Sequence, residues 1–123
     1  MEKKTFPDGS IYKGELKKGR PHGWGKMVGP DGSSYEGDWK KGLPRGRGIL
    51  KFTRGGTYEG EVKKGLPEGK GTYTWNGGIY EGQFKKSRFH GRGTLKKHDG
   101  SVIKSGRWKN GNFISRPWWK LWK

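Results

Sequence analysis

A phrase of fourteen residues occurs twice in this chain with few changes. The first copy, YEGDWKKGLPRGRG, begins at Tyr35, and the second, YEGEVKKGLPEGKG, begins at Tyr58. The tyrosine that opens the phrase also occurs at Tyr12 and Tyr80, so successive units are 23, 23 and 22 residues apart. Repetition at a fixed spacing constrains the fold strongly, because each unit must bury its apolar face against the next one.

Each unit has the pattern of a β-hairpin. In YEGEV, Tyr58, Gly60 and Val62 alternate with two glutamates and therefore share one face of a strand. GKGTYTW alternates in the same way, with Gly71 and Tyr73 on one face, and we expect the loop KKGLPE to join the two strands. PDG, RGG, NGG or HDG then marks a turn. The sequence predicts an all-β fold, an elongated, twisted antiparallel meander of tandem hairpins.

Glycine and proline together supply 31 of the 123 residues. Glycine normally weakens a strand, so the glycines on the aromatic face need a reason. We expect each to leave room for a neighbouring ring to lie flat on the backbone. On the opposite face we expect ion pairs across strands, such as Glu61 with Lys70 and Asp38 with Arg47.

The segments YEGEV, YEGDW, HGWG and FHGRG are similar to the MORN (membrane occupation and recognition nexus) repeat, in which Y-E-G-x-aromatic precedes a glycine-rich strand and a D-G turn. The resemblance covers four units from Tyr12 to about Val102, and FPDGSI and IKSGRWKNGNF resemble partial units at the two ends. It implies a scaffold or localisation module rather than a catalyst, and lipid binding is often proposed for the family. We predict a repeat array at residues 1–115 and a Trp/Lys-rich tail at 116–123.

The net charge of +17 predicts attraction to polyanions. A lysine pair ends the first strand of each unit, and we expect these pairs to line one long edge with Arg20, Arg45, Arg88 and Lys109. The spacing of strands places successive pairs roughly 10 Å apart. Two interpretations stay open, a solvated edge that resists aggregation and a stripe that binds an anionic surface. The paired lysines are Lys17, Lys18, Lys40, Lys41, Lys63, Lys64, Lys85 and Lys86.

The segment SRPWWKLWK ends the chain. On a helix, Trp118, Trp119 and Trp122 would share one side, and tryptophan with lysine suits a lipid interface. One hypothesis is therefore that the tail inserts into a membrane or a partner. The alternatives are a cap that folds over the last hairpin and a disordered tail.

The aromatic face is the second candidate surface. A sheet of one layer leaves rings accessible, and exposed aromatic patches often mark interfaces. We expect a shallow groove for a partner peptide or a second copy, although each ring can also serve packing alone. Open edge strands at both ends also permit homodimerisation. The candidate residues are Tyr12, Tyr35, Trp39, Tyr58, Trp75, Tyr80 and Phe84.

No catalytic constellation is apparent in the sequence. The absence of cysteine excludes disulfides and thiolate chemistry. His22 and His90 hold equivalent positions in their units, His98 lies in a turn, and no pair has the spacing of metal ligands. We expect a non-enzymatic protein without cofactor or metal. The N-terminus has no apolar signal region, so we also expect a cytoplasmic protein, with peripheral docking at the inner face of a membrane as a further hypothesis.

The predicted function is a scaffold or adaptor that binds a protein partner or a second copy and docks to anionic phospholipid. A basic nucleic-acid-binding module is the alternative, because positive charge with aromatic residues is the general footprint of such proteins. The separation of lysines and aromatics argues against it. A designed array without a native partner is a further alternative, although the drift between units favours a natural origin.

Overall fold

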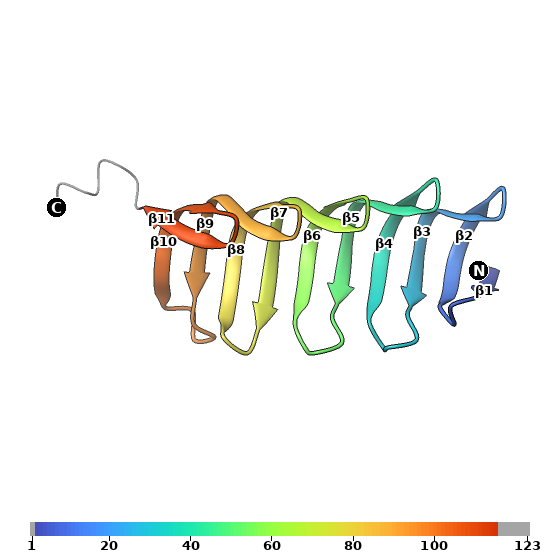
Figure 1. The fold of residues 1–123 in the computed structure, drawn as a ribbon, viewed down its shortest axis with the longest axis horizontal. Coiled ribbons are helices and arrows are strands. Elements are labelled where there is room, and N and C mark those ends of the chain that lie inside the picture. The colour runs from blue at the N-terminus through green and yellow to red at the C-terminus, as the bar shows by residue number, and fades with distance from the viewer. Residues whose placement is uncertain (1, 116–123) are drawn as a thin grey trace.

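The computed structural model describes residues 2–115, which form one antiparallel sheet of 11 strands. The strands lie side by side in chain order from one end of an elongated ribbon to the other (Figure 1). The predicted all-β meander is therefore confirmed. The expected tail helix or cap at 116–123 lies outside the described residues. The strands are β1 (Glu2–Thr5), β2 (Ile11–Lys17), β3 (Arg20–Val28), β4 (Ser34–Lys40), β5 (Leu43–Lys51), β6 (Thr57–Lys63), β7 (Leu66–Trp75), β8 (Gly78–Lys85), β9 (Arg88–Lys96), β10 (Val102–Lys109) and β11 (Asn112–Ser115).

A ladder of glycines crosses the sheet from β2 to β10. In every neighbouring pair of these strands, a glycine lies opposite a glycine. A Cβ atom added at Gly25 would overlap the ring of Tyr12, and one at Gly71 would overlap the ring of Tyr58. This confirms that the glycines allow tyrosine rings to lie on the backbone. The ladder consists of Gly14, Gly25, Gly37, Gly48, Gly60, Gly71, Gly82, Gly93 and Gly106.

The core is a row of rings along the ribbon. Trp39 packs edge-on between Tyr12 and Tyr35, with ring centroids 5.3 and 5.2 Å apart. Phe84 packs in the same way between Tyr58 and Tyr80, at 4.8 and 5.0 Å. Such edge-to-face pairs add to the stabilisation from burial. The row allows a sheet without a second layer of secondary structure to bury apolar surface.

Both ends of the hairpins have defined turns. Lys18 and Gly19 form a two-residue turn with φ values of 52° and 75°, the pattern of a type I′ turn. The expected loop KKGLPE is thus mostly strand, because β7 already begins at Leu66. At the opposite end, a two-residue turn follows Trp75, whereas five residues separate the strands in the other connections. This shorter turn accounts for the single 22-residue spacing.

The expected ion pairs on the outer face are wrong in detail. The Glu61 carboxylate accepts a hydrogen bond from the backbone amide of Lys70 at 2.7 Å, and Asp38 accepts one from the amide of Arg47 at 3.0 Å. The strand register shifts just after the ladder glycine, so this amide lies next to an irregular part of the ladder and the carboxylate satisfies it. Within residues 2–115, the one salt bridge joins Lys96 and Glu81 at 2.9 Å.

No helix that is long and apolar enough to cross a membrane occurs among the described residues.

Candidate functional site

The Lys-Gly turns are joined to one another along one edge of the ribbon (Figure 1). The amide of Gly42 donates to the carbonyl of Pro21 in the preceding unit at 2.9 Å, and the amide of Gly65 donates to Pro44 at 3.1 Å. The amide of Ser87 makes the same bond to Pro67 at 3.0 Å, and Gly111 continues the series. These bonds fix the spacing between successive turns, so the turns form a rigid stack.

We define the lysine row as the eight paired lysines of these turns, all of which are exposed. The first lysine of each pair ends a strand, and the second is the first residue of the turn. Arg20 and Arg88 are the first residues of β3 and β9, Arg45 lies two residues inside β5, and Lys109 ends β10. All four are exposed near the same edge. The structure therefore brings together the basic residues that were predicted to share an edge.

The second lysine of each pair has a backbone conformation that lysine seldom adopts. Lys18, Lys41, Lys64 and Lys86 have φ values between 48° and 52°. Such a left-handed conformation costs an L-residue other than glycine about 1–2 kcal/mol, and asparagine or glycine suits it better. The fifth turn has an asparagine, Asn110, at this position. The preference of the turn thus does not explain the four lysines.

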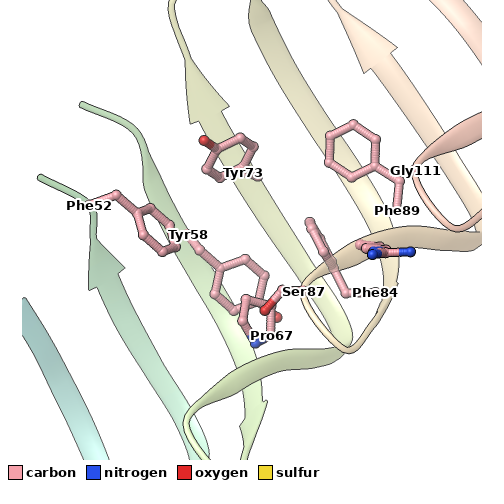
Figure 2. Close-up of a pocket in the computed structure, with 9 residues that line it drawn as sticks. Phe52, Tyr58, Pro67, Tyr73, Phe84, Ser87, Phe89 and Gly111 are labelled. Atoms are coloured by element: carbon pink, nitrogen blue, oxygen red, sulfur yellow. The ribbon is translucent and has the colours of Figure 1, made fainter. Parts of the chain in front are cut away.

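A groove opens over the third and fourth units, with a cavity of about 390 Å³ (Figure 2). Phe52 lies edge-on to Tyr73, with ring centroids 6.0 Å apart, and Phe89 stacks on the buried ring of Tyr80 at 3.8 Å. Phe52 is 41% exposed. These rings form a second layer above the core row. The lining consists of Phe52, Tyr58, Pro67, Tyr73, Phe84, Ser87, Arg88, Phe89 and Gly111.

The predicted aromatic face is mostly core. Trp75 is partly buried and packs against the core, whereas the other six residues predicted to meet a partner are buried. Their rings pack against glycine backbone and one another, so they leave little side-chain surface for a partner. The accessible rings around the third and fourth units belong instead to Phe52, Tyr73, Trp75 and Phe89, and Trp24 in β3 is 39% exposed. The six buried residues are Tyr12, Tyr35, Trp39, Tyr58, Tyr80 and Phe84.

The groove forms where the fourth unit departs from the repeat. Phe89 stands where the other three units have Pro21, Pro44 and Pro67, and Ser87 stands where they have glycine. Both residues line the groove. In the sequence, this site is marked by positions at which the units differ. The aromatic face was predicted from positions that are the same in each unit, and the prediction therefore missed the groove.

Burial affects the tyrosines of the core row. The Tyr58 and Tyr80 rings are fully buried, and this desolvation raises the pKa of each hydroxyl to about 12. The hydroxyls donate to the backbone carbonyls of Glu61 at 2.6 Å and Gln83 at 2.8 Å. At neutral pH the two side chains are uncharged hydrogen-bond donors with structural roles.

Histidines and carboxylates remain spread along the ribbon. The Nδ1 atom of His90 lies 3.5 Å from the amide of Asn110, and Nε2 of His98 lies 3.3 Å from the carbonyl of Asn76. Among residues 2–115, no group of three or more histidine, aspartate or glutamate side chains is placed to hold a metal ion.

The comparisons with known proteins agree with the repeat boundaries. The MORN repeat model matches residues 12–34, 35–57, 58–79 and 80–102. Each matched segment begins at one of the four buried tyrosines, and together they cover well over half of the chain. A search of curated proteins found no significant match. Four consecutive matched segments in one all-β sheet show that the chain belongs to the MORN repeat family.

Proposed function

We propose that this protein is a non-enzymatic scaffold that docks to an anionic phospholipid membrane through the lysine row. The observation that carries the proposal is the stack of hydrogen-bonded turns, which holds eight exposed lysines along one edge. A basic residue near an anionic membrane contributes about 1 kcal/mol to binding. A row of such residues at fixed spacing can act together, because little further ordering is needed on contact.

The position of the lysines favours binding over protection from aggregation. Aggregation through sheet edges involves unpaired edge strands, which in the described sheet are β1 and β11. The lysine row lies instead at the ends of paired strands β2, β4, β6 and β8. Four of its members also occupy the unfavourable left-handed position. Both facts support a role for the charge itself, and such docking would place the protein at the inner face of a membrane.

The aromatic groove gives the proposed scaffold a second surface. Its volume falls within the range of ligand sites, and it is lined mainly by apolar side chains with Ser87 and Arg88 as polar members. An amphipathic segment with an acidic residue beside its apolar anchors fits this chemistry. The partner would be another protein or a second copy of the chain.

Nucleic acid fits the arrangement less well. Single-strand binders combine stacking rings with a basic groove that follows the backbone. Here the lysine row lies on the turns. The accessible rings of Phe52, Tyr73 and Trp75 lie over the sheet or its opposite turns, and of the four rings around the groove Phe89 alone stands next to the lysine edge. Binding that persists at high salt and prefers one oligonucleotide would favour this alternative.

The test is flotation of the full chain with neutral and anionic vesicles at near-physiological salt. We expect flotation with anionic vesicles only.

Replacing Lys18, Lys41, Lys64 and Lys86 by asparagine should abolish this flotation. Asparagine fits the left-handed conformation, so the turns should keep their structure. The matched control replaces Lys13, Lys26, Lys51 and Lys70, which are exposed in strands, by glutamine. Equal losses in both variants would indicate diffuse charge, and no flotation of the native chain would refute membrane docking. A chain ending at Ser115 tests whether the tail contributes.

A further inference from the structure

The fourth Lys-Gly turn contains a serine in place of glycine. The equivalent positions hold Gly19, Gly42, Gly65 and Gly111, whereas the fourth unit has Ser87 with a φ of 69°. The preceding Lys86 has a φ of 48°. This is therefore the one turn of the five in which both residues are non-glycine and left-handed. Backbone strain retained in this way is a reason to look for a function.

The surroundings of Ser87 are those of a target for a basophilic protein kinase. Its side chain is exposed, and within the described residues its hydroxyl makes no hydrogen bond. The hydroxyls of Ser33 and Ser101, by contrast, each donate to an aspartate at 2.6 Å. Ser87 is also the one serine of the chain with a basic residue on both sides, in the order Lys-Lys-Ser-Arg. An acidic substrate groove would attract this segment.

We propose that Ser87 is a phosphorylation site, and that phosphate there weakens the binding of the lysine row to anions. The reaction transfers the γ-phosphoryl group of ATP to the Ser87 Oγ atom. A bond forms between Oγ and phosphorus, the bond from phosphorus to the β,γ-bridging oxygen breaks, ADP leaves, and the hydroxyl proton passes to the catalytic base of the kinase. The kinase itself is the co-reactant that the proposal requires.

Backbone strain in the turn at Lys86 and Ser87 also makes Ser87 more accessible to a kinase. A folded turn must open before it enters a kinase groove, and turns of low local stability open most often. The bond from the Ser87 amide to Pro67 holds this turn to its neighbour, as glycine amides hold the other turns. The two left-handed non-glycine residues therefore make this turn the weakest of the stack.

The effect of the phosphate follows from its place. Phosphoserine carries a charge of about −1.5 to −2 at neutral pH, and it would stand between Lys86 and Arg88, with Lys85 one residue further. It would pair with these cations and neutralise about two of the positive charges on the edge that carries the lysine row. Figure 2 shows Ser87 beside Pro67 at the groove, so the phosphate would also alter the rim of that surface. The loss of anion binding rests on the proposed function, whereas the modification itself does not.

The first experiment treats the full chain with ATP and the catalytic domain of a basophilic serine kinase. Intact mass and fragmentation then count and locate the phosphate. We expect one phosphate, at Ser87, and none on Ser87→Gly, which restores the glycine of the other turns and should fold at least as well. No phosphate on the native chain, or phosphate on other serines with Ser87 unmodified, would overturn the proposal.

The second experiment compares phosphorylated and unphosphorylated chains on heparin and on anionic vesicles. We expect about 30-fold weaker partitioning to vesicles after phosphorylation and elution from heparin at lower salt. Unchanged elution of the Ser87-phosphorylated chain from heparin would overturn the inhibitory effect. If the unphosphorylated chain elutes from heparin at higher salt but does not bind vesicles, membrane docking fails while the proposal for Ser87 stands.

Discussion

A tyrosine and the glycine beneath it form the smallest stabilising unit of this protein. The ring lies where the glycine has no side chain, and its hydroxyl reaches a backbone carbonyl three residues ahead, as Tyr58 does with Glu61. Neither residue is replaceable alone. A side chain on the glycine displaces the ring, and loss of the ring leaves the backbone exposed.

We predict that Gly71→Ala destabilises the array by about 3 kcal/mol or more. Overpacking in a filled site costs about 1–3 kcal/mol, and here the added Cβ would overlap the ring of Tyr58, which is fully buried and has little room to move. Urea unfolding measures the change. The control is Gly100→Asn, at a turn where an added Cβ has no atom within 4 Å, so that its smaller cost comes from the φ of 92° alone, which asparagine adopts more readily than most residues. Equal stability of the two variants would contradict the role of the ladder.

The buried tyrosines also predict an alkaline limit. The pKa values of Tyr58 and Tyr80 are raised from 10.0 to about 12, so the folded state disfavours the phenolate. Their contribution to stability is complete below pH 10 and is lost as the pH rises from about 10 to about 12. Urea midpoints across this range, followed with phenolate absorbance, test the prediction. The loss should be smaller in Tyr58→Phe, and titration of the folded protein's buried tyrosines near pH 10 would contradict it.

At the scale of the element, the sequence predicts the strands of each hairpin better than the length of the turn between them. Strict alternation around Tyr58 and Gly60 predicted β6, whereas the second strand was predicted too short, because β7 begins at Leu66 rather than at Gly69. KKGLPE was predicted as a loop, yet Pro67 lies in β7 opposite Val62, next to the register shift. There the lack of an amide hydrogen on proline costs little, and the Pro67 carbonyl accepts a hydrogen bond from the neighbouring turn. The sequence alone could not show this, because the donating amide, that of Ser87, belongs to the next hairpin.

The turn geometry yields a prediction about stability. Lys64→Asn should raise the free energy of unfolding by about 0.5–1 kcal/mol, because asparagine tolerates the left-handed conformation that lysine disfavours at a φ of 51°. Thermal or urea unfolding measures it. Lys63→Gln removes the same charge from the neighbouring strand residue and should change stability little. A gain of the same size in both variants would indicate relief of charge repulsion rather than of backbone strain.

For the whole molecule, repetition defines the fold and deviation from it defines the candidate site. The lysine row was predictable because its members recur in each unit. The buried tyrosines recur too, and they build the core, with Tyr58 alone of the four also lining the groove. The groove depends on Ser87 and Phe89, which break the pattern, and on contacts between units that no single unit contains. The repeat spacing therefore predicts the architecture but not the groove, which depends on residues that differ between units.

The linear arrangement also predicts how the molecule opens. Each strand contacts its neighbours in the chain order, so stability should approximate a sum of units and the interfaces between them. β1 and β11 have one neighbour each in the described sheet and only four residues. Native-state hydrogen exchange should therefore show the least protection in these strands and the greatest from β4 to β8, with a gradient between them. Gly71→Ala should lower protection most in β6 and β7. If protection is instead uniform from β2 to β10, and Gly71→Ala lowers it equally in all of these strands, the sheet unfolds as one cooperative unit.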